Sequence, residues 1–155
     1  MNRRKFVTLL GGAAAAWPLA AHAQQDAQVR RIGVLMPGDE TDPVRKTIVS
    51  AFTQALADLG WADGRNVRID LRWGGDDTNR MRAVAQELVS LQPDIILTGG
   101  TQPTAALQQE TRTIPIVFAG TSDPVAQRIV ARLDRPGGNI TGFGSFETLA
   151  GRQVA

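Results

Sequence analysis

The sequence contains no cysteine, no tyrosine and a single histidine, His22. The absence of thiols excludes disulfide bonds, thiol catalysis and cysteine-ligated zinc or iron–sulfur clusters. His22 lies in a segment with the features of a cleaved leader, so the remaining chain would have no imidazole. Ser-His-Asp catalysis and a histidine-ligated zinc site are then excluded as well. Carboxylates, hydroxyls and Lys46 are the groups left for acid–base chemistry.

The chain also carries little excess charge, with 17 Lys and Arg against 15 Asp and Glu. A nucleic-acid partner is not expected, because such proteins need a clustered basic face. The length of 155 residues fits one domain and suffices for a substantial hydrophobic core.

Residues 1–23 have the three parts of an export signal. Basic residues at positions 3–5 precede a mildly apolar stretch, and Ala21-His22-Ala23 is a small-x-small cleavage site. The apolar stretch is shorter than the about 20 residues that a membrane span needs, which disfavours an uncleaved anchor. The paired arginines are similar to a twin-arginine signal, and ordinary Sec export is the alternative. We expect cleavage near Ala23, residues 24–29 as a linker, and a periplasmic protein.

Short apolar runs and segments of helical period alternate along the rest of the chain. The expected strands span 31–36, 67–73, 95–97, 115–119 and 140–143. The expected helices span 43–59, 77–91, 103–110 and 124–133. This alternation predicts a parallel sheet with helices on both faces, joined by right-handed crossovers. The fold class is therefore α/β, a three-layer, Rossmann-like (flavodoxin-like) arrangement.

The second expected strand differs from the others, because apolar residues alternate with Arg68, Asp70 and Arg72. Such alternation is typical of a half-exposed strand at a sheet edge. It favours the strand order 2-1-3-4-5 over 3-2-1-4-5, which would place these charges inside the sheet. We expect Arg68 and Asp70 to be exposed.

Ligands of open α/β sheets bind beyond the carboxyl ends of the strands. Three loops at that edge carry a Pro at an expected helix start, in Asp42-Pro43, Gln102-Pro103 and Asp123-Pro124. Helix N-termini offer free N–H groups and positive dipoles to a carboxylate or phosphate. Each loop taken alone is better explained by helix capping, and the convergence of the three loops on one edge is what favours a binding site. The predicted ligand-binding residues are Gly38, Asp42, Gly100, Thr101, Gln102, Thr121, Ser122 and Asp123.

Motifs for bound cofactors are missing from the sequence. No phosphate-binding loop occurs and no dinucleotide fingerprint follows the first strand, so we expect no cofactor. The acidic loop with Asp39, Glu40 and Asp42 is typical of a solvated surface, and we expect no metal site there.

Several segments resemble the periplasmic substrate-binding proteins of ABC transporters, in the family that includes aromatic amino-acid binders. They are Ala51-Phe52 to Asn66, Gly99-Gly100-Thr101, Pro115-Ile116-Val117-Phe118, Asp123-Pro124-Val125 and the run from Arg135 to Gly142. The resemblance implies two Rossmann-like lobes that close on a small ligand, the type I periplasmic-binding-protein fold. It places residues 30–144 in the first lobe and 145–155 at the start of the hinge or crossover to a second lobe. Gln127-Arg128 departs from the small residues that relatives usually have.

The resemblance implies the solute-binding component of an ABC importer, capturing a small organic ligand, with an amino acid as one option. Its partners would be the permease and ATPase of the membrane complex. Truncated to its first lobe, the chain should bind weakly, no better than about millimolar. Two alternatives remain at this point. One is a periplasmic sensor partner, and the other, disfavoured by the missing imidazole, is a flavodoxin-like enzyme that uses carboxylates. We expect no enzymatic activity.

Overall fold

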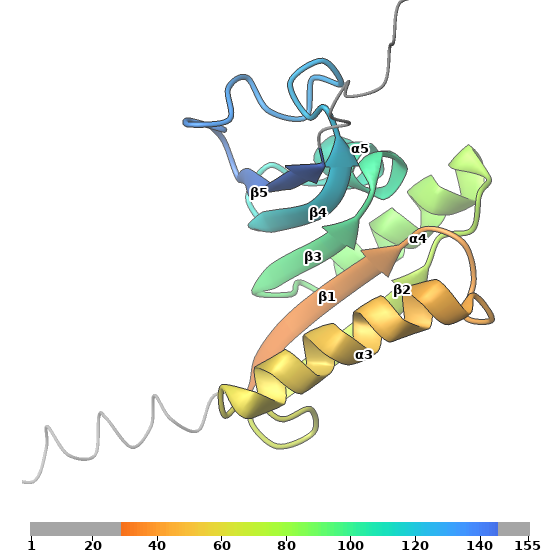
Figure 1. Ribbon diagram of the computed structural model, residues 1–155, viewed down its shortest axis with the longest axis vertical. Coiled ribbons are helices and arrows are strands. Elements are labelled where there is room, and N and C mark those ends of the chain that lie inside the picture. The colour runs from red at the N-terminus through yellow and green to blue at the C-terminus, as the bar shows by residue number, and fades with distance from the viewer. Residues whose placement is uncertain (1–28, 146–155) are drawn as a thin grey trace, which may run out of the picture.

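The computed structural model of the chain describes residues 29–145 (Figure 1). Its strands are β1 (Arg30–Met36), β2 (Val67–Trp73), β3 (Ile95–Gly99), β4 (Ile116–Ser122) and β5 (Ile140–Ser145). Its helices are α3 (Pro43–Asp58), α4 (Thr78–Ser90) and α5 (Thr101–Glu110). The predicted leader, the linker up to residue 28 and nearly all of the predicted hinge lie outside the described residues.

All strands pair in parallel in one sheet of order β2-β1-β3-β4-β5. The predicted fold class and strand order are thereby confirmed. The register places Ile32 beside Ile69 on β2 and Ile95 on β3. Side chains alternate between the two faces along each strand, and residues paired across neighbouring strands point to the same face. Ile32, Ile69 and Ile95 therefore share one face of the sheet.

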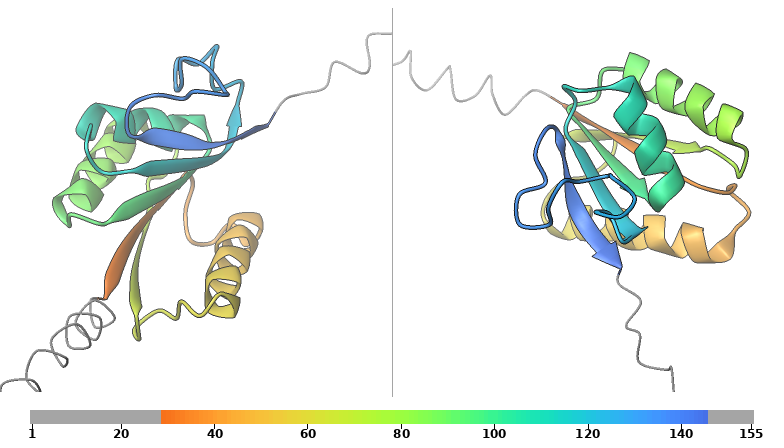
Figure 2. Two further views of the ribbon diagram at one scale, coloured as in Figure 1. Left: turned by 90° about the vertical axis from the view of Figure 1, so that its left-hand side faces the viewer. Right: turned by 90° about the horizontal axis from the view of Figure 1, so that it is seen from above.

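The hydrophobic core lies between the sheet and the layer formed by α4 and α5 (Figure 2). Gly33 of β1 lets α4 approach closely, because a Cβ there would lie 3.1 Å from the Leu88 side chain. The core residues are Leu35, Met81, Ala85, Leu88, Ile96, Leu107, Ile114, Ile116, Phe118, Ile129, Val130 and Ile140. Within the described range, no helix is long and apolar enough to cross a membrane.

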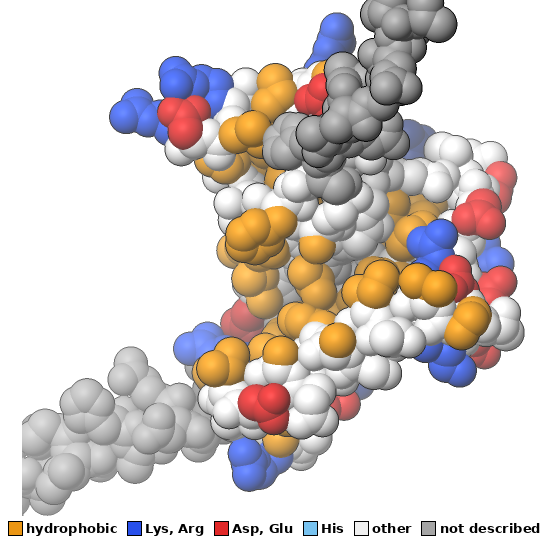
Figure 3. Space-filling model, in the orientation of Figure 1, with side chains coloured by type: hydrophobic (Ala, Val, Ile, Leu, Met, Phe, Trp, Pro, Cys, Tyr) orange, Lys and Arg blue, Asp and Glu red, His pale blue; other side chains and the backbone are white. Residues whose placement is uncertain are grey.

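Among the described residues, α3 is the one helix on the opposite face of the sheet (Figure 2). None of its residues is buried, and Ile48 of its apolar stripe is 54% exposed. Beside α3, the face over β3, β4 and β5 is open, and Phe143 is 77% exposed there. Figure 3 shows apolar side chains gathered in the hollow next to α3. The apolar period correctly predicts helix α3, but α3 is not packed tightly onto the sheet.

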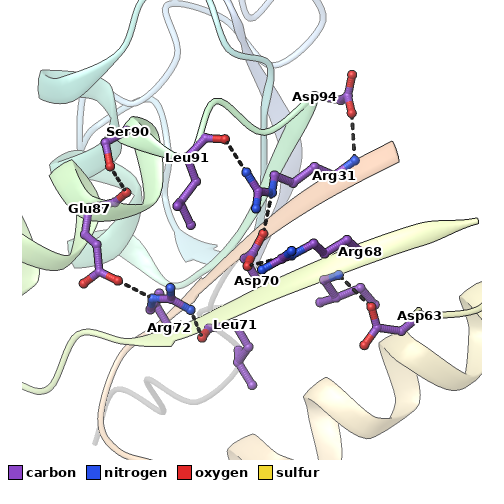
Figure 4. A network of polar contacts seen from close by, with 11 residues as sticks. Arg31, Asp63, Arg68, Asp70, Leu71, Arg72, Glu87, Ser90, Leu91 and Asp94 are labelled. Carbon is purple, nitrogen blue, oxygen red and sulfur yellow. Dashed lines mark hydrogen bonds and ion pairs between the residues drawn. The ribbon is translucent and has the colours of Figure 1, made fainter. Parts of the chain in front are cut away.

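The predicted exposure of strand β2 is confirmed for Arg68 and wrong for Asp70. The Asp70 side chain is only 9% exposed, whereas that of Arg68 is 64% exposed. Arg31 of the neighbouring strand places its Nε 2.8 Å from Asp70 Oδ2, and Arg68 Nε lies 3.5 Å from Oδ1 (Figure 4). A buried carboxylate is tolerated where cations neutralise it. The ion pairs with Arg31 and Arg68 explain why the Asp70 carboxylate is buried although β2 is an edge strand.

The predicted helix 124–133 is wrong, because the chain forms turns there. A single helical turn begins at Pro124 and ends at Arg128, which has a left-handed φ of 57°. The next N–H, that of Ile129, bonds back to the Pro124 carbonyl at 2.8 Å. This bond pattern is that of a Schellman motif, which terminates helices. The departure noted at Gln127-Arg128 therefore coincides with the end of the turn.

Candidate functional site

The predicted ligand-binding loops all lie at one edge of the molecule. They follow β1, β3 and β4, and the carboxyl ends of parallel strands meet at the same edge. The expectation that three helices begin there is only partly right. Helix α3 begins at Pro43 as predicted, α5 begins earlier than predicted, and Pro124 begins a turn.

At the first loop, Asp42 caps α3. Its carboxylate accepts hydrogen bonds from the N–H groups of Val44 (2.9 Å) and Arg45 (3.2 Å). The Arg45 guanidinium donates to it through Nε at 2.7 Å. The backbone N–H of Arg45, followed by its side chain, holds the pKa of Asp42 below its ordinary value of 3.8. The carboxylate of Asp42 is therefore engaged by the first turn of its own helix.

Gly38 lies in the same loop and forms a two-bond backbone bridge with Gly75, which follows β2. Its φ of 72° suits glycine. A Cβ at Gly38 would also lie 3.1 Å from Arg45 Nε. Gly38 therefore makes room for the arginine.

At the second loop, Gly100 is the N-cap of α5 and has a φ of 86°. Helix α5 starts at Thr101, two residues before the predicted start at Pro103, because the glycine turn admits the chain directly into the helix. Gly100 has no side chain to cap the helix, so N–H groups of the first turn are left for another acceptor. The Gln102 side chain reaches instead toward the Asp76 carbonyl, at 3.4 Å.

At the third loop, Thr121, Ser122 and Asp123 differ in exposure. Thr121 is fully buried, whereas Ser122 and Asp123 are exposed. Asp123 has a φ of 39°, and its carboxylate accepts a hydrogen bond from the Ala126 N–H at 3.1 Å. Of these three residues, Ser122 alone is exposed and has no hydrogen bond from its side chain to any described residue of the neighbouring turn.

A cavity of about 320 Å³ opens at the same edge, between α3 and the ends of β1, β3 and β4. Its lining includes Met36, Arg45, Ile48, Leu97, Gly100 and Ala119. Gly100 is the one predicted site residue that lines it. Sequence reasoning missed Arg45 and Gly120, although Arg45 could have been found as the charge that follows the cap Asp42 on α3.

A second cavity, of about 440 Å³, lies at the opposite edge of the sheet, where Trp61 and Leu56 meet Ile32. It contains none of the predicted site residues. In the described part of the chain, no cluster of acidic or histidine side chains could hold a metal ion. The predicted edge offers apolar walls, the Arg45 guanidinium and, at the start of α5, which has no side-chain cap, backbone N–H groups.

Comparisons with known proteins agree with the observed fold. The Tyrosine-binding protein of Clostridioides difficile (strain R20291) is 34% identical over 98 residues, covering 63% of this chain and 28% of the relative. The Streptococcus pneumoniae ABC domain in complex with L-Trp is 28% identical, with a TM-score of 0.68, covering 74% of this chain and 38% of that one. A ligand-free, open substrate binding protein with adhesive properties from Clostridium difficile is 30% identical, with a TM-score of 0.72 over 78% of this chain and 40% of that one.

The chain thus spans 40% or less of the length of these relatives. A family model for ABC transporter substrate binding proteins matches residues 32–154, which include every described strand and helix except the first two residues of β1. That family consists of binding proteins. The resemblance seen in the sequence is confirmed: this chain belongs to the ABC transporter substrate binding protein family.

Proposed function

We propose that the chain forms a lobe of a solute-binding component of an ABC importer and captures an amino acid in the periplasm. Residues 30–144 would form this lobe, and 145–155 would lead toward a hinge. The family match over residues 32–154 carries the proposal. The relatives described as tyrosine-binding and as a complex with L-Trp support an aromatic amino acid as the ligand class.

The described residues support binding better than catalysis. The predicted edge offers backbone N–H groups at the start of α5 and the Arg45 guanidinium, both suited to the carboxylate of an amino acid. The transporter permease and ATPase would be the membrane partners, and no enzymatic step is needed for this role.

A calorimetric titration of the 155-residue chain against aromatic amino acids, aliphatic amino acids and a neutral sugar tests the function. We expect saturable binding of the aromatic amino acids, with a dissociation constant of about 1 mM, or −4 kcal/mol, because a single open lobe offers only part of a closed site. Heats that are the same for the sugar as for the amino acids would contradict the proposal.

Export through a cleaved leader, residues 1–23, completes the proposal. N-terminal sequencing of periplasmic material checks it, with Gln24 as the expected first residue. A start far from Gln24 would show that the segment has another role.

A further inference from the structure

Helix α3 carries an apolar stripe along one exposed side. Four residues at helical spacing form this stripe: Val44, Ile48, Ala51 and Ala55. All four are exposed, and the exposed fraction of Val44 is 68%. Ile48 lines the cavity at the carboxyl edge together with Leu97 of β3. The stripe therefore faces across the sheet, toward β3 and β4.

The hollow beside α3 has an uncharged floor, formed by the open face of β3, β4 and β5. Pairing across these strands places five residues on that face: Leu97, Val117, Ala119, Thr141 and Phe143. Thr141 is the one polar residue among them, and Phe143 is 77% exposed. Figure 3 shows apolar side chains along α3 and in the hollow next to it. A contiguous apolar surface of this kind marks an interaction site.

The hollow is as wide as one further helix. Three strands spaced about 4.8 Å apart span about 14 Å, and a helix with its side chains is about 10–12 Å wide. Within the described residues, α3 is the one helix on this face of the sheet (Figure 2). A second helix in the hollow would contact the stripe and the floor at the same time.

A second copy of the chain supplies such a helix. The α3 helix of one copy can enter the hollow of its partner while the partner's α3 enters the first hollow, so both copies offer the same surface. The two sheets then lie outside and the two helices between them. This arrangement requires a two-fold axis along the helices, which are therefore parallel. Neither the stripe nor the floor contains a charged residue, so their pairing brings no like charges together.

The area of this surface is sufficient for a specific dimer. Helix α3 has 16 residues and is therefore about 24 Å long. The helix and the three strands together span a width of about 24 Å. The surface then measures about 600 Å² on each copy. The resulting total of about 1,200 Å² exceeds the roughly 1,000 Å² expected of a specific interface.

We propose that two copies of this chain associate through the stripe and the floor, with the α3 helix of each copy in the hollow of the other. This association goes beyond the proposed function and needs no ligand. Its tests measure the oligomeric state, so they can fail or succeed separately from the titration with amino acids.

The first test places a charge in the stripe. The 155-residue chain is sedimented over a range of concentrations, and we expect a dimer with a dissociation constant of roughly 10 µM. Ala51→Glu puts one carboxylate of each copy at the two-fold axis and should raise this constant at least about tenfold. Ala57→Glu makes the same change at an exposed position on the side of α3 opposite the stripe, and should leave the constant unchanged.

The second test changes the floor and serves also if Ala51→Glu does not fold. Phe143→Ser alters an exposed side chain, so circular dichroism should show an intact fold. We expect the dissociation constant to rise at least about tenfold. Leu133→Ser is the control, because Leu133 is an exposed apolar residue outside the stripe and the floor. It should leave the dimer unchanged.

The third test uses the absence of cysteine from the chain. In the proposed dimer the two copies of Ala55 face each other across the two-fold axis. We expect mild oxidation to link Ala55→Cys into a covalent dimer. Ala57→Cys, on the opposite side of the same helix, should stay unlinked.

The remaining outcomes contradict the proposal. A wild-type chain that sediments as a monomer at every concentration would overturn the second copy as occupant of the hollow. The hollow would then be left to a segment outside the described residues or to another partner. A dimer that neither Ala51→Glu nor Phe143→Ser weakens would overturn the assigned surface. Linking of Ala57→Cys as fast as Ala55→Cys would overturn the arrangement of the helices.

Discussion

At the scale of the residue, Asp42 links the stability of α3 to the geometry of the site. Its carboxylate accepts two backbone N–H groups of the first helical turn and also holds the Arg45 guanidinium. These bonds favour the charged carboxylate, so its pKa is below the ordinary value of 3.8. The stabilisation is therefore fully present above pH 3.8 and is lost as the pH falls through the lowered folded-state pKa.

Asp42→Ala should lower the urea midpoint of unfolding at neutral pH, because the cap of α3 is lost. The difference from wild type should shrink as the pH is lowered below 3.8, where the wild-type carboxylate becomes protonated. Asp58→Ala, at the end of the same helix, is the control and should not lower the midpoint. A gap between wild type and Asp42→Ala that widens in acid would contradict the assignment.

At the scale of the element, the sequence predicted the strands and their order well. The charged alternation in β2 marks an edge, and the continuous apolar run of β3 marks a central strand. Asp70 was mispredicted because its partner Arg31 lies on a neighbouring strand and is invisible to a local pattern. The helix expected at 124–133 failed because Arg128 adopts a left-handed conformation that no residue preference announces.

The candidate site, like the fold, could be predicted from the sequence only in part. The sequence correctly predicted that the loops after β1, β3 and β4 lie at one edge of the sheet. The cavity of about 320 Å³ could not be predicted, because it depends on the distance between α3 and the sheet. The apolar period of α3 predicts which side of the helix faces the sheet. It does not predict how far the helix lies from β3.

The two helix layers should differ in how much each stabilises the fold. Leu88 of α4 is fully buried, whereas Leu59 at the C-cap of α3 is 76% exposed. Leu88→Ala should cost about 3 kcal/mol, as for large-to-small changes in a packed core. Leu59→Ala should stay within about 0.5 kcal/mol of wild type. Chemical denaturation compares the two variants, and equal losses would contradict the exposure of Leu59 at the end of α3.

At the scale of the whole molecule, the two faces of the sheet differ in how well they are packed. The α4 and α5 face holds the core, and the α3 face has exposed apolar side chains (Figure 3) and the cavity of about 320 Å³ at the carboxyl edge. Under the proposed function, the residues that stabilise the fold and those that bind the ligand would lie on different parts of the sheet.

The most direct measurement maps the ligand onto the sheet. Backbone amide NMR signals of the 155-residue chain are followed while L-tryptophan is added to saturation. The account predicts that the largest shifts fall at the carboxyl edge, around Gly38, Gly100 to Gln102 and Gly120 to Asp123, and that they follow one binding curve. Largest shifts at the opposite edge, around Asp63 and Asp94, or shifts that never saturate, would contradict it.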